Sequence, residues 1–171
     1  MRLIFWEQRA LKTYQEDNDE LGLARVMQLQ GKLYTEFSNF EEAISSYMDA
    51  LEIASDNGEV KMKADIQIQL GLVFQELGQF DETKKLFSKA INIWEDSGDT
   101  LKLSEAYFYM ANLEKLQGKI DEALIAIQNS IVLAEYAKSE KGLANSYFEL
   151  GQIYELKDEF IMDRILLSKI I

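Results

Sequence analysis

The stretch LGQFDETKKLFSKAINI, residues 77–93, appears in related form three times at a fixed spacing. Forty residues earlier the chain reads FSNFEEAISSYMDALEI (37–53), and forty residues later it reads QGKIDEALIAIQNSIVL (117–133). Within 77–94 the apolar residues recur at three- and four-residue steps, which places them on one face of a helix. A helical unit repeated at constant spacing is typical of an array in which each unit packs on its neighbours. In such an array we expect the function to lie in a surface and not in a reaction centre.

The forty-residue period runs through four registers without an insertion. Three columns show it: a small residue (Gly31, Gly71, Ala111, Gly151), an aromatic residue or isoleucine (Phe40, Phe80, Ile120, Phe160) and a large apolar residue (Tyr47, Phe87, Ile127, Leu167). The small residues let two helices approach closely, and the large apolar residues fill the space between them. Stacking is then needed to stabilise the array, because one helix pair cannot cover its own apolar face.

Turn-forming residues divide the chain into helices. We predict a leading helix at 2–16, pairs at 20–37/40–56, 60–77/80–96 and 100–117/120–137, and a last pair at 140–156/159–170. We interpret Asn57-Gly58 as a helix C-cap and turn, since no alternating strand pattern flanks it. The predicted domain organisation is one repeat domain, 1–171, with a leading helix at 1–18 and repeats at 20–58, 60–98, 100–138 and 140–171, the last atypical or truncated.

This pattern, G-x-x-Y/F followed by G-x-F/I-x-x-A-x-x-x-Y/F-x-x-A-L/I, resembles the tetratricopeptide repeat. The resemblance covers nearly the whole chain. It implies an all-α, right-handed solenoid of antiparallel helix pairs. The period exceeds the usual length of about 34 residues, and the proline that ends the second helix is missing because the chain has no proline. Both departures fit the longer-helix variety, which is similar to repeats of peptide-sensing regulators, kinesin light chains and cell-polarity scaffolds.

The resemblance also implies where a partner binds. In tetratricopeptide arrays the first helix of each pair lines the concave face, which by position implies a binding stripe of Arg25, Gln28, Lys32, Thr35, Asp65, Ile68, Leu72, Gln75, Glu105, Phe108, Asn112, Lys115, Asn145, Phe148, Gln152 and Glu155. Its apolar members form either the floor of a peptide groove with a polar rim or contacts between neighbouring helices; the sequence leaves both open. The amides of Asn112 and Asn145 could order a peptide backbone.

One subtype of the family is disfavoured. Chaperone-tail binders present lysines and asparagines along this stripe to clamp a terminal carboxylate. Here Asp65 and Glu105 would repel a carboxylate, and most of the required cations are absent.

Charge limits the class of partner. With 30 acidic and 18 basic residues the net charge is −12, so we expect neither nucleic acid nor an anionic membrane as partner, and we expect a protein or peptide, with a basic one favoured. The longest apolar run near the N-terminus, 3–6, is too short for a secretory signal, and the sequence contains no membrane span. We therefore expect a cytoplasmic protein.

Composition argues against catalysis. The chain has no histidine and no cysteine, which removes the commonest general base, the commonest transition-metal ligand and the thiolate nucleophile. The acidic run 16–20 does not fit a calcium loop, since counting from Asp17 places Leu21 at the fifth position and Gln28 at the twelfth. We interpret it as an acidic first turn of a helix. We expect no cofactor, no metal and no enzymatic activity.

The C-terminal segment is the least regular. In the predicted last helix, Asp163 stands where Ala43 and Ala123 stand, and Ile170 replaces a small residue. This apolar helix leaves three interpretations: a shifted register, a homodimer contact, or a chain that is a piece of a longer array.

The leading functional hypothesis is a non-catalytic protein- or peptide-binding scaffold that uses the concave face. The alternative is a peptide-sensing regulatory module that controls an attached or partner effector, such as a transcription regulator, kinase or phosphatase.

Overall fold

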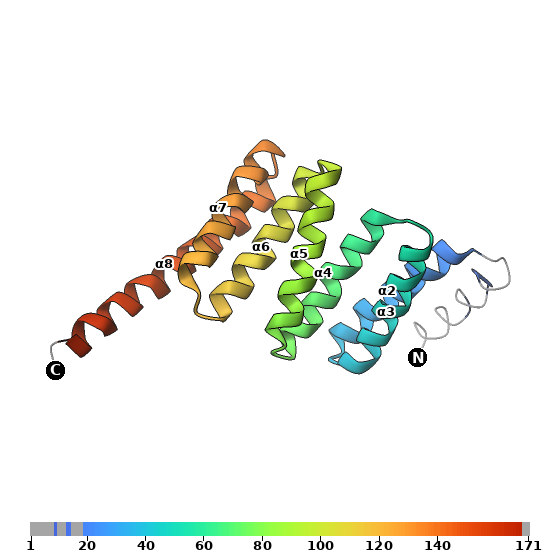
Figure 1. Ribbon diagram of the computed structural model, residues 1–171, viewed down its shortest axis with the longest axis horizontal. Helices are drawn as coiled ribbons and strands as arrows, with labels where there is room; N and C mark the ends of the chain where they lie inside the picture. Colours follow the sequence, from blue (N-terminus) through green and yellow to red (C-terminus); the bar gives the residue numbers. More distant parts are fainter. Residues whose placement is uncertain (1–8, 10–12, 15–18, 169–171) are drawn as a thin grey trace. The chain divides into compact units, whose positions relative to one another are not determined.

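The computed structural model describes residues 9, 13, 14 and 19–168, with 159–168 described by their backbone. In this part of the chain all regular structure is helical, as the sequence predicts: α2 (Glu20–Glu36), α3 (Phe40–Asp56), α4 (Val60–Glu76), α5 (Phe80–Ser97), α6 (Thr100–Leu116), α7 (Ile120–Tyr136) and α8 (Glu140–Ser168) (Figure 1). From α2 to α7 every helix boundary lies within one residue of its predicted position.

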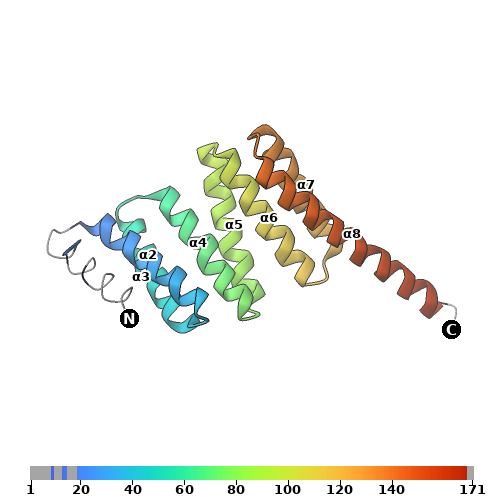
Figure 2. The ribbon, with the colours of Figure 1, turned by 180° about the vertical axis from the view of Figure 1, so that it is seen from behind.

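The last predicted pair is wrong. Residues 140–156 and 159–170 were expected to form two helices, but α8 continues without a break through the expected turn at 157–158 and is 29 residues long. Both views of the ribbon show α8 continuing beyond the end of α7 (Figures 1 and 2). The segment 155–160, ELKDEF, contains no glycine, so nothing in it forces the helix to end.

The chain divides into two compact units, Met1–Ile93 and Trp94–Ile171. In the first unit α3 packs against both α2 and α4, and in the second α7 packs against both α6 and α8. The core of the first unit is built from alanines and a few large side chains, of which Tyr47, Ile66 and Val73 are almost completely buried. This alternation of small and large residues is what two closely packed helices need.

The small column lies directly under the large apolar column, as predicted. A Cβ atom added at Gly31 would lie 2.7 Å from the ring of Tyr47, and one added at Gly71 would lie 2.6 Å from the ring of Phe87. The third pair carries Ala111 with Ile127 in the same two columns, and both are fully buried. A larger residue in one column is thus matched by a smaller one in the other, which keeps the packed volume similar.

The turns are alike. Every twentieth residue from 38 to 138 has a positive φ between 54° and 71°: Ser38, Gly58, Gly78, Gly98, Gly118 and Lys138. At Ser38 the backbone N–H donates to the Thr35 carbonyl, and the next N–H, of Asn39, donates to the Tyr34 carbonyl. This is the Schellman arrangement, which satisfies the last helical carbonyls without proline. The predicted C-cap and turn at Asn57-Gly58 is confirmed, with φ 69° at Gly58.

The predicted leading helix lies mostly outside the described residues. Its residues 9, 13 and 14 are described, and they are helical. At the start of α2, Asp19 is the N-cap, and its Oδ1 accepts a hydrogen bond of 2.8 Å from the Gly22 N–H. Asp19 and Glu20 therefore form the acidic first turn that the sequence predicts. No described helix is long and apolar enough to cross a membrane.

Candidate functional site

None of the residues in the predicted stripe is fully buried. Exposed members are Arg25, Lys32, Glu105, Asn145, Phe148 and Glu155; half-buried members are Gln28, Thr35, Asp65, Ile68, Leu72, Gln75, Phe108, Asn112, Lys115 and Gln152. Ile68, Leu72 and Phe108 are partly covered by their surroundings, whereas Phe148 is 70% exposed. The apolar members therefore differ, and Phe148 is the one that is freest to meet a partner.

In the first unit the stripe contains a direct link between first helices. The Gln28 amide on α2 donates a hydrogen bond of 3.1 Å to the amide oxygen of Gln69 on α4. Arg25 and Lys32 lie exposed on α2.

In the second unit polar side chains join α6 to α8 more tightly. Lys115 Nζ lies 2.7 Å from Glu149 Oε1 and 2.7 Å from Gln152 Oε1, and the Asn112 amide donates to Glu149 Oε1 over 3.3 Å. The side chains of Lys115 and Glu149 are only 13% and 5% exposed. Their charges compensate each other at close range, so this network fixes the spacing of the two helices.

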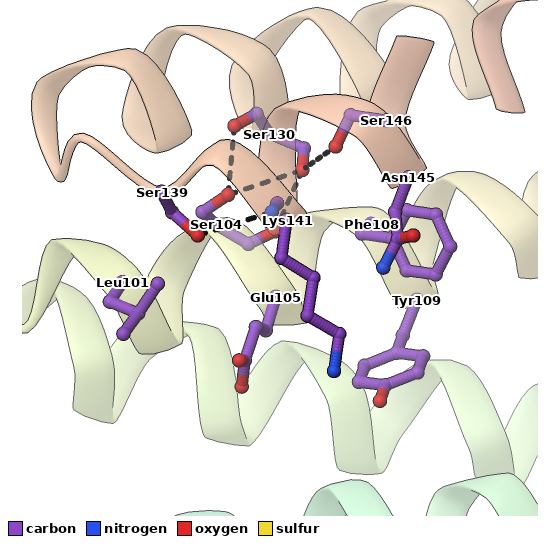
Figure 3. Close-up of a pocket in the computed structure, with 11 residues that line it drawn as sticks. Leu101, Ser104, Glu105, Phe108, Tyr109, Ser130, Ser139, Lys141, Asn145 and Ser146 are labelled. Carbon is purple, nitrogen blue, oxygen red and sulfur yellow. Dashed lines mark hydrogen bonds between the residues drawn. The ribbon is translucent and has the colours of Figure 1, made fainter. Parts of the chain in front are cut away.

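A pocket of about 160 Å³ lies between α6 and the first turns of α8. Three predicted residues line it, namely Glu105, Phe108 and Asn145, together with Tyr109 and Lys141. The Lys141 side chain extends along the opening, between Glu105 and Tyr109 (Figure 3). Pockets for small-molecule ligands usually have about 300–1,000 Å³, whereas a cavity of about 150 Å³ holds one benzene. The pocket therefore has room for one side chain of a partner.

Three buried serines form the floor of the pocket. The Ser104 hydroxyl donates to the Ser130 carbonyl over 2.8 Å, and the Ser130 hydroxyl donates to the Ser104 carbonyl over 2.9 Å. The Ser146 and Ser130 hydroxyl oxygens lie 2.9 Å apart (Figure 3). The three residues are at most 2% exposed and come from α6, α7 and α8. They therefore join three helices beneath the pocket.

The hydrogen-bond geometry fixes what this floor offers to a ligand. Each hydroxyl has one proton, and the protons of Ser104 and Ser130 point at main-chain carbonyls. With this arrangement Ser146 donates to Ser130. The oxygen lone pairs that remain can accept hydrogen bonds, so the floor favours a group that donates.

Aromatic and charged groups surround this floor. Phe108 and Tyr109 pack edge to face with ring centres 5.7 Å apart. Burial raises the pKa of the Tyr109 hydroxyl above its usual value, and the nearby Glu105 carboxylate raises it further. Lys102 Nζ lies 3.6 Å from Glu105 Oε2. The opening thus carries charges of both signs.

Sequence reasoning missed the serines and Glu149. Ser104 and Ser130 occupy columns in which the earlier pairs carry alanines, Ala24 with Ala50 and Ala64 with Ala90. The paired change to serine was visible, but nothing in the sequence showed that the two columns meet. Glu149 shares a column with Leu29, Gln69 and Tyr109, which have no common chemistry.

Two models of the tetratricopeptide repeat match the sequence, one over residues 63–135 and one over residues 24–57. Together they cover more than half of the chain. The chain is a tetratricopeptide repeat protein. Helices α2, α4, α6 and α8 begin forty residues apart, which confirms the longer period. Repeats of this family are generally interaction scaffolds without catalytic activity. No match to a curated protein is found by sequence.

Solved structures share this fold. Aspartyl phosphate phosphatase F from Bacillus subtilis matches with a TM-score of 0.83 and 21% identity, over 96% of this chain and 44% of that one. The Rap conjugation gene regulator of plasmid pLS20, solved with the Phr* peptide, matches with a TM-score of 0.73 and 20% identity, over 84% of this chain and 40% of that one. The Arabidopsis OM64 tetratricopeptide domain matches with a TM-score of 0.63 and 15% identity, over 80% of this chain and 98% of that one. The chain thus spans less than half the length of the first two proteins.

Proposed function

We propose that this tetratricopeptide protein is a non-catalytic scaffold that binds a protein or peptide segment along the first helices of its repeats. The pocket between α6 and α8 is the observation that carries the proposal. It lies within the stripe, it has the size of one side chain, and the exposed Phe148 stands one helical turn beyond Asn145 at its edge. A partner would place an anchor side chain in the pocket and pack an apolar neighbour on Phe148.

The floor and the charge of the protein define the anchor. An anchor that donates hydrogen bonds, such as lysine, arginine or glutamine, would use the hydroxyl oxygens of the serine floor as acceptors. A basic anchor also gains from the nearby Glu105 and from the net charge of −12. Lys141 opposes a cation, but its long, exposed side chain can rotate out of the opening.

The alternative proposal, a peptide-sensing regulatory module, finds support in the likeness to the aspartyl phosphate phosphatase and the Rap regulator. Both are more than twice as long as the matched region, so the effector would lie outside these repeats or in a partner. A sensor would change its shape when the peptide binds, whereas a scaffold would keep it, and small-angle X-ray scattering with and without peptide separates the two.

The binding proposal can be tested with peptides selected from a displayed random library on the intact chain. Calorimetric titration of a selected peptide is then compared between wild type and Phe148→Glu. We expect Phe148→Glu to weaken binding at least about tenfold, a change of about 1.4 kcal/mol. Because Phe148 is 70% exposed, the variant should keep the helical circular dichroism of the wild type.

The matched control is Phe37→Glu, which changes an equally exposed phenylalanine (74%) in the turn after α2. We expect it to bind like the wild type. If no peptide is enriched, or if Phe148→Glu binds as tightly as the wild type, the proposed site is wrong.

A further inference from the structure

One face of α8 lies open where every other first helix is covered. Ala144 and Gly151 are exposed, and Tyr154 is 47% exposed. The residues in the columns of Ala144 and Gly151 are buried in all three earlier pairs: Ala24, Ala64 and Ser104, and Gly31, Gly71 and Ala111. The column of Tyr154 holds Tyr34 and Phe74, which are half-buried, and Glu114, which is buried.

In the first two pairs, the second helix of the same repeat covers this face. The rings of Tyr47 and Phe87 lie over Gly31 and Gly71. At Gly151, by contrast, an added Cβ would have no neighbour within 4 Å. The open face of α8 therefore has the shape that receives a second helix, and among the described residues no helix covers it.

The sequence of the chain supplies a segment of the matching type. Residues 159–170 lie in the register of a second helix, with Phe160 in the column of Phe40 and Leu167 in the column of Tyr47. In the structure, however, residues 159–168 continue α8. Position 158 is the equivalent of Ser38, Gly78 and Gly118, each of which has a positive φ at the turn inside a pair. At Asp158 the chain remains helical, so the expected hairpin is open.

An open hairpin determines which copy of the segment can cover the face. The 29 residues of α8 extend about 44 Å, whereas the 17 residues of α7 extend about 26 Å. A continuous helix cannot fold back on itself, so residues 159–168 cannot reach Gly151 of their own chain. The same residues of a second chain can.

We propose that two copies of this chain exchange residues 159–168, each segment packing on the Ala144–Gly151–Tyr154 face of the other copy as a second helix. This is domain swapping through a hinge at Lys157-Asp158. Asp163 occupies the column of Ala43 and Ala123, so the exchanged helix packs less well than its counterparts. The dimer is therefore reversible and depends on concentration. The exchanged dimer forms without a bound peptide.

Engineered cysteines test the exchange directly, because the chain has none of its own. Positions 151 and 167 correspond to Gly31 and Tyr47, which touch in the first pair. We expect a mixture of the Gly151→Cys chain and the Leu167→Cys chain to form a disulfide-linked dimer on mild oxidation, in higher yield than either chain alone. Light scattering after gel filtration should give twice the monomer mass for the wild type at high concentration.

Two single substitutions and one control variant make the test decisive. Asp158→Gly supplies the residue found at Gly78 and Gly118, and it should close the hairpin and shift the mass to that of a monomer. Gly151→Glu places a charge on the open face and should also give a monomer, while Lys138→Gly, in another turn, should leave the dimer intact. A monomeric wild type at high concentration, a dimer that survives Gly151→Glu, or a cysteine mixture without a mixed disulfide would overturn the proposal.

Discussion

At the scale of the residue, one methyl group decides how closely two helices of a pair can approach. Gly71 lies under the ring of Phe87, and a Cβ atom there would be 2.6 Å from a ring carbon. The ring is rigid and fully buried, so it cannot move aside. We expect Gly71→Ala to lower the free energy of unfolding by about 1–3 kcal/mol, despite the better helix propensity of alanine. Urea denaturation followed by circular dichroism measures this.

Two further variants isolate the cause. Gly71→Ala combined with Phe87→Ile recreates the Ala111 and Ile127 pair of the third repeat, and it should recover part of the lost stability. Within one chain Gly151→Ala has open space around the new methyl group, so at a concentration at which the chain is monomeric it should stabilise the chain slightly, by about 0.5–1 kcal/mol. Equal effects of Gly71→Ala and Gly151→Ala would show that the ring contact is not the cause.

Two turns carry a side chain where the others carry glycine. Ser38 has φ 59° and Lys138 has φ 54°, in the left-handed region that costs residues other than glycine about 1 kcal/mol. Both side chains are exposed. We therefore expect Ser38→Gly and Lys138→Gly each to raise the free energy of unfolding by up to about 1 kcal/mol, measured by the same denaturation. Glu59→Gly, next to Gly58 and not at a positive φ, should not stabilise the chain.

At the scale of the element, the helices were predictable because each boundary carries a local signal. Glycine or serine marks the turns, and the apolar period marks the face of each helix. The prediction failed at α8 because it relied on the forty-residue period where the local signal was missing. Position 158 carries aspartate, not the glycine or serine of the equivalent turns. Where the repeat period alone indicates a turn and no local residue favours it, the helix continues, because each further residue adds a helical hydrogen bond.

The link between α6 and α8 rests on a nearly buried ion pair. Removing Glu149 leaves the Lys115 ammonium with little solvent, and the Gln152 amide oxygen, 2.7 Å away, becomes its partner among the described residues. We expect Glu149→Ala to lower the free energy of unfolding by about 3 kcal/mol, because an uncompensated charge would remain inside. Glu149→Gln keeps an acceptor for Lys115 but removes the compensating charge, so it should cost less than Glu149→Ala without restoring the stability of the wild type.

The comparison is with the ion pair of Lys157 and Asp121, which are 3.0 Å apart with side chains 38% and 83% exposed. Asp121→Ala should change the free energy of unfolding by at most about 1 kcal/mol. If Glu149→Ala costs no more than Asp121→Ala, the polar network does not fix the spacing of α6 and α8.

At the scale of the whole molecule, titration should leave stability unchanged near neutral pH, since the chain has neither histidine nor cysteine. Burial raises the pKa of the hydroxyls of Tyr47, Tyr107 and Tyr109 in the folded chain. The unfolded chain therefore releases these protons first, at about pH 10. Stability is complete below that pH and falls as the pH rises above it.

Thermal unfolding measured below and above pH 10 checks this expectation. Tyr109→Phe should make the alkaline decrease shallower, because one raised pKa is removed. Tyr136→Phe, which changes a tyrosine that is 78% exposed, is the control. An equal alkaline decrease in wild type and Tyr109→Phe would contradict the argument.

The sequence could place the binding stripe but not its chemistry. Resemblance to the family puts Glu105, Phe108 and Asn145 on first helices, and the structure brings them to one pocket. The serine floor needs the contact of three helices, which no single-helix pattern shows. The difference between a half-buried Phe108 and an exposed Phe148 arises because α8 has no further helix packed beside it in the described chain.

The most direct test of the proposed peptide site is amide hydrogen exchange, measured with and without a peptide selected on the intact chain. Binding between α6 and α8 predicts slower exchange in residues 101–112 and 140–149, with little change in α3 and α7. Protection confined to α3 or α7, with α6 and α8 unchanged, would contradict the assignment of the site to the first helices.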